Sequence, residues 1–324
     1  MYNISGENLI RCAQTGGNQA GRNDQTCRDS PRRHYMNTQK MIQVLLTAID
    51  SGSLTKAGEI LGYTQSNLTQ MMRSFEDEVG FPLLIKTKKG VEPTREALQL
   101  LPTMRAMRAQ EEKFFQEIAD ISGIKRGTIR IGTFVSTSTS WLPRLLDYFQ
   151  DNCPEVVFEI VESGQDEMES GVADGSLDIA LLSEPERKSI DFIPLLDDPM
   201  LVVFSEKHDL SNYDYVPVDV LRDYPLIMTY QSYDRDVRKV FDQAGFVPEV
   251  KYYFRDDFAV LSMVQHGLGI AVLPELIIEK HPGDYDSRML DPESYRTLGI
   301  GIKSIKEAGP LARSVITYLK ENVR

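Results

Sequence analysis

Apolar residues recur at helical spacing through residues 41–79, where they form three consecutive stripes. The stripes are Met41, Val44, Leu45, Ala48 and Ile49, then Leu54, Ala57, Ile60 and Leu61, then Leu68, Met71, Met72, Phe75 and Val79. Spacings of three and four residues predict amphipathic helices. A tight turn at Leu61-Gly62-Tyr63 separates the second stripe from the third. The pattern therefore predicts a helix-turn-helix that a preceding helix covers.

The third predicted helix has an unusual polar face, made of Ser66, Thr69, Gln70 and Arg73. A face that only keeps a helix soluble is usually rich in Glu and Lys, whereas this one carries amides, hydroxyls and one cation. Such side chains suit base edges and phosphates in a major groove, into which a helix-turn-helix inserts its second helix. The alternative is an ordinary pair of core helices.

A short hairpin is predicted after this helix. Gly80 can end the helix in the left-handed conformation, and Pro82 prevents its continuation. An apolar strand, a Lys86–Gly90 turn and a returning Val91 follow. This is a two-stranded wing with Lys86, Lys88 and Lys89 at its tip. The lysines suit contact with DNA phosphates, and the alternative is a solvated hairpin tip.

A long helix is predicted to begin at Pro93-Thr94 and to end at Ser122-Gly123. Its apolar residues are Leu98, Leu101, Met104, Met107, Phe114, Ile118 and Ile121. We expect Pro102 to bend or interrupt its first turns. One apolar stripe on a helix outside a compact domain needs a partner, which a coiled-coil-like pairing of two chains provides. The alternative is a helix packed on its own domain.

From Gly127 onward, strands alternate with helices. Strands are expected at 128–132, 156–161, 177–182, 200–204 and 226–229, and helices at 141–149 and 168–173. This alternation predicts an α/β domain with a largely parallel sheet. Trp141 is expected in its core or packed between lobes.

The segment GSLTKAGEILGYTQSNLTQMMRSFEDEVGFPLLIKTKKGVEPTREA (52–97) resembles the N-terminal domain of LysR-type transcriptional regulators. It departs from the family pattern at Gly58, where a second alanine is usual, at Ser66-Asn67 in place of Pro-Ala, and at Gln70 and Lys86, where arginine is frequent. The TIRIG, LDIALL and GLGIAVLP segments resemble strands of the same family's effector domain. The resemblance implies a homo-oligomer, dimer or tetramer, that regulates transcription.

This resemblance implies a fold of three parts. They are a winged helix-turn-helix at 36–95, a linker and dimerisation helix at 96–125, and an effector-binding domain at 126–324. That domain would have two Rossmann-like lobes, as in a periplasmic binding protein, with lobe I at 126–197 and 266–324 and lobe II at 198–265. Crossovers are expected near Asp197-Asp198 and near Gln265-His266. Residues 1–35 lack a continuous apolar core, and we expect either a disordered tail or translation starting at Met36.

Candidate DNA contacts follow from the helix face, the wing and the family motif. They are Ser53, Thr64, Gln65, Ser66, Asn67, Thr69, Gln70, Arg73, Lys86, Lys88 and Lys89.

Candidate effector contacts lie where strands end, because a two-lobed α/β domain binds small molecules at the carboxyl ends of its strands. The stretch Thr133–Ser140 lies just before a predicted helix and carries five consecutive hydroxyls at Ser136–Ser140, which suits a carboxylate, although one hydroxyl is needed as a cap. Two weaker segments follow the second strand and the strand at 226–229, and Asp256-Asp257-Phe258 either approaches the cleft or caps a helix. The candidates are Ser136, Thr137, Ser138, Gly164, Gln165, Thr229 and Tyr230.

The chain has 324 residues and a net charge of −12, and the charge is unevenly distributed. Residues 36–95 carry seven basic and six acidic side chains, whereas residues 126–324 carry 20 and 34. The acidity therefore lies away from the expected DNA contact, and a near-neutral head can still bind duplex when two copies act together.

No motif of catalysis, metal binding or membrane insertion is present. The three cysteines and four histidines are scattered, and no apolar run reaches the roughly eighteen residues of a membrane helix. We therefore expect no enzyme activity, no cofactor, no metal and no membrane contact, and a cytoplasmic location. Expected partners are double-stranded DNA, a small-molecule effector and a second copy of the chain, with RNA polymerase as a further candidate. The alternatives are a solute-binding receptor and an enzyme on an α/β scaffold.

Overall fold

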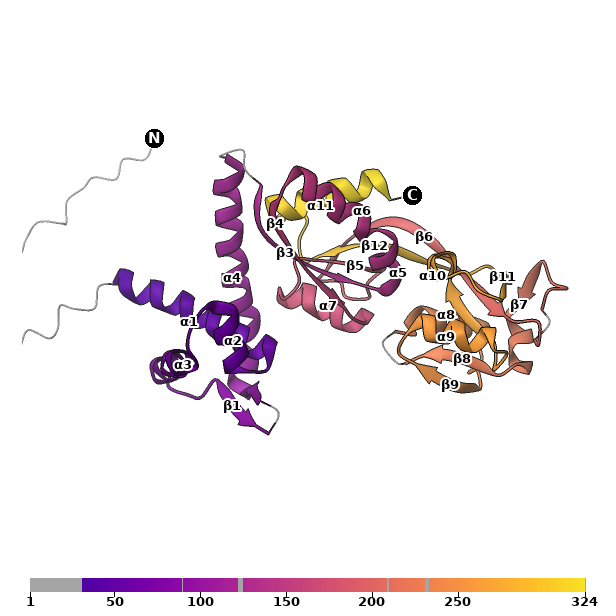
Figure 1. The fold of residues 1–324 in the computed structure, drawn as a ribbon, viewed down its shortest axis with the longest axis horizontal. Coiled ribbons are helices and arrows are strands. Elements are labelled where there is room, and N and C mark those ends of the chain that lie inside the picture. Colours follow the sequence, from indigo (N-terminus) through magenta and orange to yellow (C-terminus); the bar gives the residue numbers. More distant parts are fainter. Residues whose placement is uncertain (1–30, 89, 122–124, 209, 231–232, 324) are drawn as a thin grey trace, which may run out of the picture.

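The structure is a computed structural model that describes residues 31–88, 90–121, 125–208, 210–230 and 233–323. Figure 1 shows a helical head with a small wing, a long helix beside it, and an α/β region of two lobes. This confirms the predicted fold class. The N-terminal elements are α1 (Pro31–Ser51), α2 (Leu54–Leu61), α3 (Gln65–Val79), β1 (Leu84–Thr87), β2 (Gly90–Pro93) and α4 (Arg95–Ile121).

Helix α1 begins five residues before Met36, where the DNA-binding domain is expected to start. Helix α1 begins at Pro31, so residues 31–35 are helical. Residues 1–30, for which a disordered tail or a later translation start is expected, lie outside the described residues.

The head forms as predicted because each short helix carries its own start and stop signals. Ser53 and Thr64 cap α2 and α3, and their hydroxyls accept hydrogen bonds from backbone N–H groups three residues later. Gly62 and Gly80 end the helices with φ of 71° and 85°. The three apolar stripes meet in one core, with one exception. Ile60 is 67% exposed, because its side chain lies on the outer face of α2.

Hydrogen bonds to backbone groups hold the wing against the head. The Glu76 carboxylate accepts hydrogen bonds from the N–H groups of Leu83 and Leu84 at 2.8 and 3.2 Å, which fixes the chain between α3 and β1. Val91 N–H donates to the Gly52 carbonyl at 2.9 Å. Lys86 lies in β1 rather than in the turn as expected, because its pairing with Val91 extends the ladder. Lys89 lies outside the described residues.

Helix α4 joins the head to the α/β region. It begins at Arg95 after a Thr94 cap and runs 27 residues, so Pro102 does not interrupt it. Leu101 and Met104 belong to the core of the head. In contrast, Phe114 and Ile121 in the second half are 57% and 88% exposed.

The first lobe has a central sheet with helices on both faces (Figure 1). Helices α6 and α11 pack with Trp141 against one face, as expected for that residue, and α7 covers the other. Its elements are β3 (Arg126–Thr133), α5 (Val135–Ser140), α6 (Leu142–Asn152), β4 (Glu155–Glu162), α7 (Gln165–Asp174), β5 (Ile179–Ser183), the first half of β6 (Asp191–Phe204), β12 (Tyr295–Ile302) and α11 (Pro310–Asn322).

The second lobe is built around the other half of β6. Strands β10 and β11 pair with residues 200–204 of β6, and Leu226, the first residue of β8, forms a bridge to Ile270 beside β10. Its elements are β7 (Tyr215–Pro217), the short 3-10 helix η1 (Val218–Asp223), β8 (Leu226–Thr229), α8 (Arg235–Ala244), β9 (Val250–Phe254), α9 (Asp257–Gln265), β10 (Ala271–Pro274), α10 (Glu275–Lys280) and β11 (Asp286–Asp291).

Two expectations about this region need correction. The sheet is mixed rather than largely parallel, because β12, β10 and β11 all run antiparallel to β6. The first crossover lies in β6 at Asp197–Met200, as expected. The return does not lie near Gln265-His266, because β10 and β11 still pair with the second-lobe half of β6. The chain returns between Asp291 and Tyr295, where β12 pairs with the other half.

Candidate functional site

The exposed face of α3 presents the side chains predicted to contact DNA. Gln65, Ser66, Asn67, Gln70 and Arg73 are exposed, whereas Leu68, Met72 and Phe75 on the opposite side are buried. No described residue forms an ion pair with Arg73 within 4 Å. The face thus offers amides, a hydroxyl and one free cation to a partner.

The predicted hydroxyl contacts have local structural roles in this surface. Thr69 is half-buried, and its hydroxyl donates to the Gln65 carbonyl at 2.8 Å. Ser53 and Thr64 are the N-caps of α2 and α3. Each hydroxyl keeps acceptor capacity, so a phosphate-facing role remains compatible with these bonds.

The wing adds positive charge beside α3. Lys86 and Lys88 are exposed, on β1 and in the turn after it. Neither forms an ion pair with a described residue, so both charges are available to an anionic partner.

A narrow cleft lies between the two lobes. Its lining includes three of the predicted effector residues, Ser136, Gln165 and Thr229. The open space between the lining side chains is about 40 Å³, enough for only a few water molecules. A ligand can therefore enter only if the lobes separate.

The other predicted effector residues do not line the cleft, and for Thr137 and Ser138 the reason is that residues 135–140 themselves form a helix, α5. Within α5, the Thr137 hydroxyl bonds to the Thr133 hydroxyl at 2.7 Å. Ser138 donates to the Glu162 carboxylate at 2.5 Å. Gly164 is the N-cap of α7, and Tyr230 stacks on Tyr253. These four residues are absent from the cleft lining.

Sequence reasoning missed an ion pair at the base of the cleft. Arg296 of β12 contacts Asp198 of β6 through two nitrogens at 2.7 and 2.9 Å, and it donates to the Ser136 hydroxyl at 2.8 Å. The other Asp198 oxygen accepts from Leu276 N–H at 3.1 Å. The side chains of Arg296 and Asp198 are only 9% and 1% exposed. The sequence predicts a crossover near Asp198, but no sequence pattern indicates that this residue pairs with Arg296.

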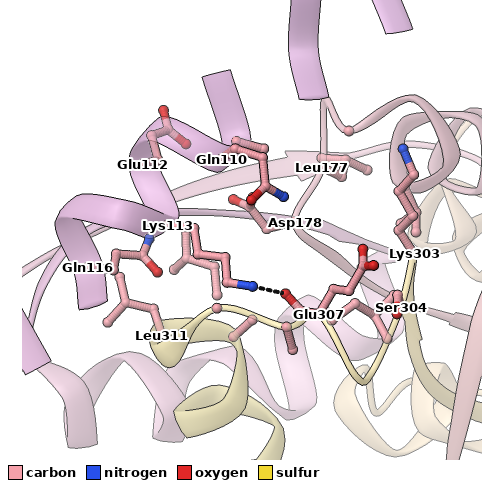
Figure 2. Close-up of a pocket in the computed structure, with 18 of the residues that line it drawn as sticks. Gln110, Glu112, Lys113, Gln116, Leu177, Asp178, Lys303, Ser304, Glu307 and Leu311 are labelled. Atoms are coloured by element: carbon pink, nitrogen blue, oxygen red, sulfur yellow. Dashed lines mark hydrogen bonds between the residues drawn. The ribbon is translucent and has the colours of Figure 1, made fainter. Parts of the chain in front are cut away.

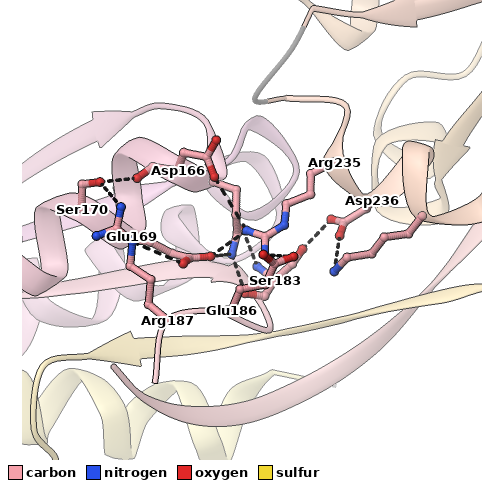
Figure 3. Close-up of polar contacts among 10 residues, drawn as sticks. Asp166, Glu169, Ser170, Ser183, Glu186, Arg187, Arg235 and Asp236 are labelled. Atoms are coloured by element: carbon pink, nitrogen blue, oxygen red, sulfur yellow. Dashed lines mark hydrogen bonds and ion pairs between the residues drawn. The ribbon is translucent and has the colours of Figure 1, made fainter. Parts of the chain in front are cut away.

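A second set of charges bridges the lobes (Figure 3). Arg235 of α8 contacts Glu169 of α7 at 2.7 Å and Glu186 at 2.6 Å. Ser183 donates to Asp236 of α8 at 2.5 Å. Burial raises the pKa of Glu169, but hydrogen bonds from Gln165 and Arg235 outweigh it, so this pKa is lowered overall. We call the contacts of Arg235 with Glu169 and Glu186, together with that of Ser183 with Asp236, the inter-lobe clamp.

Gln165 lines the cleft, but its side-chain amide is already hydrogen-bonded to other groups of the protein. The amide nitrogen donates to Glu169 at 2.8 Å and to the Ser183 carbonyl at 2.9 Å. The amide oxygen accepts from Ser183 N–H at 3.2 Å. Gln165 therefore serves first to orient Glu169 within the clamp.

Four polar side chains of the cleft have no hydrogen-bond or ion-pair partner among the described residues. They are Thr229, which is buried, Tyr233, Arg255 and Asp257. Burial raises the pKa of Asp257 to about 6, although the positive charge of Arg296 opposes this shift. Asp256 caps α9, whereas Asp257 lines the cleft. The segment 256–258 therefore both caps a helix and approaches the cleft, through different residues. The cleft therefore offers two hydroxyls, one cation and one carboxylate to a ligand.

A separate cavity of about 130 Å³ lies at the joint between α4 and the first lobe (Figure 2). Lys113 of α4 donates to the Glu307 carbonyl there at 2.9 Å. Arg130 of β3 contacts Glu112 of α4 at 2.8 and 2.9 Å. Polar contacts thus fasten the long helix to its own first lobe.

Within the described ranges, no three His, Cys, Asp or Glu side chains gather as metal ligands would. In the same part of the chain, no helix is both long and apolar enough to cross a membrane.

The chain matches two models of one protein family. The LysR substrate binding domain matches residues 122–324, and the bacterial regulatory helix-turn-helix protein of the lysR family matches residues 40–98. Together these matches cover most of the chain, which therefore belongs to the LysR family. Among its curated relatives is the uncharacterized HTH-type transcriptional regulator YvbU of Bacillus subtilis, 28% identical over 86% of this chain and 97% of the relative.

Solved structures show the same fold. A full-length OxyR variant from Pseudomonas aeruginosa is 18% identical, with a TM-score of 0.70 over 88% of this chain and 95% of that one. Full-length CbnR complexed with its target DNA is 16% identical, with a TM-score of 0.59 over 88% and 99% of the two chains.

Proposed function

We propose that this LysR-family protein regulates transcription by binding duplex DNA through α3 and the wing, under the control of a small molecule in the inter-lobe cleft. The observation that carries the DNA part is the exposed amide, hydroxyl and arginine face of α3 beside two unpaired lysines. CbnR, a relative in fold, has been seen with its target DNA. A helix face of this chemistry fits a major groove, and wing lysines fit phosphates.

The residues we assign to DNA contact are those predicted from the sequence. Gln65, Ser66, Asn67, Gln70 and Arg73 face the groove in this proposal, with Thr69 at its edge. Ser53, Thr64, Lys86, Lys88 and Lys89 contact phosphates. Phosphate contacts position the protein, and base contacts select the sequence.

The chain acts as a dimer or tetramer in this proposal, and α4 supplies the pairing surface. Phe114, Phe115 and Ile121 are exposed on this helix, where a second copy of α4 can bury them. Pairing places two copies of α3 on a two-fold DNA site, which adds contacts that a single helix lacks. In this proposal residues 36–95 form the DNA-binding head, residues 96–125 the linker and dimerisation helix, and residues 126–324 the effector domain.

The effector that fits the cleft is a small zwitterion such as an amino acid. Asp257 and Arg255 are the unpartnered charges of the lining, and they have opposite signs. An ammonium group on Asp257 and a carboxylate on Arg255 would satisfy both, with the Thr229 hydroxyl as a further partner. A ligand with only negative charge would leave Asp257 unpaired and would place a second negative charge beside it.

The DNA part is tested by a mobility shift of the native chain on the DNA upstream of its own gene. We expect a specific complex at modest salt, and none with a Gln70→Ala, Arg73→Ala variant. A native chain that ignores this DNA would contradict the proposal. It would favour a solute receptor, which the lobes alone would suggest.

The ligand class is tested by thermal shift with the twenty amino acids, their N-acetyl derivatives and their deaminated carboxylates. We expect stabilisation by at least one free amino acid and loss of that effect when its amine is acetylated. Equal stabilisation by a deaminated carboxylate would refute the zwitterion. No cofactor, catalytic residue or metal enters the proposal, and the protein acts in the cytoplasm without enzymatic turnover.

A further inference from the structure

Helix α7 lines the inter-lobe cleft at one end and contacts α4, the helix that carries the DNA-binding head, at the other. Its first half carries Glu169, which belongs to the clamp (Figure 3), and Gln165, whose amide donates to Glu169. Its last residue, Asp174, contacts Arg105 of α4. Ten residues of helix span about 15 Å, so one rigid element connects two sites that share no side chain.

At the cleft end, the charge balance of α7 depends on the other lobe. The Glu169 side chain is 3% exposed, and its strongest cationic contact is Arg235 of the second lobe at 2.7 Å. Arg187 of the first lobe lies farther away, at 3.7 Å. Separation of the lobes removes Arg235 and leaves a buried carboxylate without its main partner, which is unfavourable. The first half of α7 must then shift or expose Glu169 to water.

At the other end of α7, one arginine connects Asp174 to the DNA-binding head. Arg105, held by Asp174, also contacts Asp50 of α1 at 3.1 Å. Asp50 is the second-last residue of α1, directly before the turn into α2. The Arg105 side chain is largely buried, so a displacement of Asp174 cannot be absorbed by moving this guanidinium freely into solvent.

The end of α7 is itself well fixed. Gly175 ends the helix with φ of 77°, and the Asp174 carboxylate accepts a hydrogen bond from Ser176 N–H at 2.9 Å. Asp174 therefore follows the helix rather than moving independently of it.

We propose that α7 transmits opening of the cleft to the DNA-binding head through Asp174, Arg105 and Asp50. This rests on the proposed function, because it concerns how the cleft controls DNA binding. The clamp sets the position of α7, and α7 sets the position of Arg105 against α1. The head is thereby reoriented relative to the first lobe, which changes the spacing of two heads in a dimer.

A double-mutant cycle on the full-length protein tests this without knowledge of the effector. Glu169→Gln weakens the clamp while keeping side-chain size, and Asp174→Asn weakens the joint in the same way. We expect Glu169→Gln to change affinity for the upstream DNA roughly fivefold or more in the native background. In the Asp174→Asn background the same change should have less than about twofold effect. Equal effects in the two backgrounds would overturn this connection through α7, Asp174, Arg105 and Asp50, which we call the relay.

Glu112→Gln is the matched control for the joint. It weakens a contact of α4 with Arg130 of the first lobe that does not involve α7. In that background Glu169→Gln should keep its full effect, and loss of the effect there would overturn the special role of α7. Arg235→Gln, which weakens the clamp from the other lobe, should reproduce Glu169→Gln and guards against a folding defect of that variant.

Hydrogen exchange separates failure of the relay from failure of the proposed function. Exchange of the peptide covering residues 41–51 of α1 is measured in the same variants without DNA. We expect faster exchange in Glu169→Gln than in the native chain, and no added change when Asp174→Asn is already present. If DNA binding is absent but this pattern holds, the relay stands and the proposed function fails. An α1 peptide that is indifferent to Glu169→Gln would overturn the relay itself.

Discussion

The ion pair between Asp198 and Arg296 yields the sharpest prediction of stability. Asp198→Asn removes the charge but keeps the size of the side chain and its ability to accept from Leu276 N–H. The substitution leaves the Arg296 guanidinium, 9% exposed, without its counter-ion. Removing one partner of a buried pair costs about 3–5 kcal/mol, and we expect about 3 kcal/mol because asparagine retains a hydrogen bond. For a domain of about 200 residues this lowers Tm by about 6–12 °C.

The assay is thermal unfolding of the full-length protein, followed by circular dichroism, with urea unfolding to obtain the free energy. Asp219→Asn is the control, because Asp219 pairs with Arg222 at 3.2 Å while both side chains are exposed. An exposed pair contributes about 1 kcal/mol or less, so this variant should unfold close to the native chain. The double variant Asp198→Asn, Arg296→Met should recover much of the loss, since the stranded cation is gone.

Two results would refute the reasoning. One is an Asp198→Asn protein that unfolds within about 1 kcal/mol of the Asp219→Asn control, the difference expected for an exposed pair. The other is a double variant no more stable than Asp198→Asn alone, which would mean that the isolated guanidinium is not the source of the cost.

Four further predictions concern DNA, pairing and the cleft. Arg73→Ala should weaken binding to the upstream DNA while leaving the oligomer intact by light scattering, and unchanged affinity would remove Arg73 from the contact list. Lys86→Gln with Lys88→Gln should reduce the log–log salt slope of DNA binding by roughly two units, one per lost phosphate contact, measured by fluorescence anisotropy. Phe114→Glu should shift the protein toward monomer in sedimentation, because it places a charge on the apolar face of α4; an unaltered distribution would locate the pairing elsewhere. Burial raises the pKa of Asp257 to about 6, so the folded state binds the proton more tightly than the unfolded chain and stability falls as pH rises from about 4 to 6. Asp257→Asn should therefore stabilise the protein relative to native at pH 7.5 but not at pH 4, and an equal difference at both would contradict the assignment.

The head could be predicted in detail because its determinants are local. Residues 52–97 carry periodic apolar positions, N-caps at Ser53 and Thr64, and glycines that end α2 and α3, all within a few residues of the structure that each specifies. Helical periodicity also separates the buried side of α3 from its exposed side, so the candidate DNA surface follows from the sequence alone. The exceptions are Ile60 and Thr69, whose exposure depends on how α2 and α3 turn against α1.

The cleft could be predicted only in part, because its lining comes from distant segments. Ser136, Gln165, Arg235, Asp257 and Arg296 meet only after β6 and the return to β12 have set the two lobes side by side. The sequence showed a hydroxyl-rich segment, but whether it is a loop or the helix α5 depends on packing against α10 and the sheet. Which charges are neutralised and which stay free was likewise decided by the fold, since an acidic chain offers each arginine many carboxylates.

The sequence by itself thus determined the family, the helix proposed to face DNA, and the order of strands and helices, because contacts within a few residues fix these features. Tertiary structure alone decided that Arg296 pairs with Asp198, that Arg235 clamps Glu169, and that α7 ends on Arg105. Those partners lie 66 to 98 residues apart, and no local pattern selects between them. Only the closing of the chain into lobes brings them within hydrogen-bond distance and excludes the water that would otherwise screen their charges.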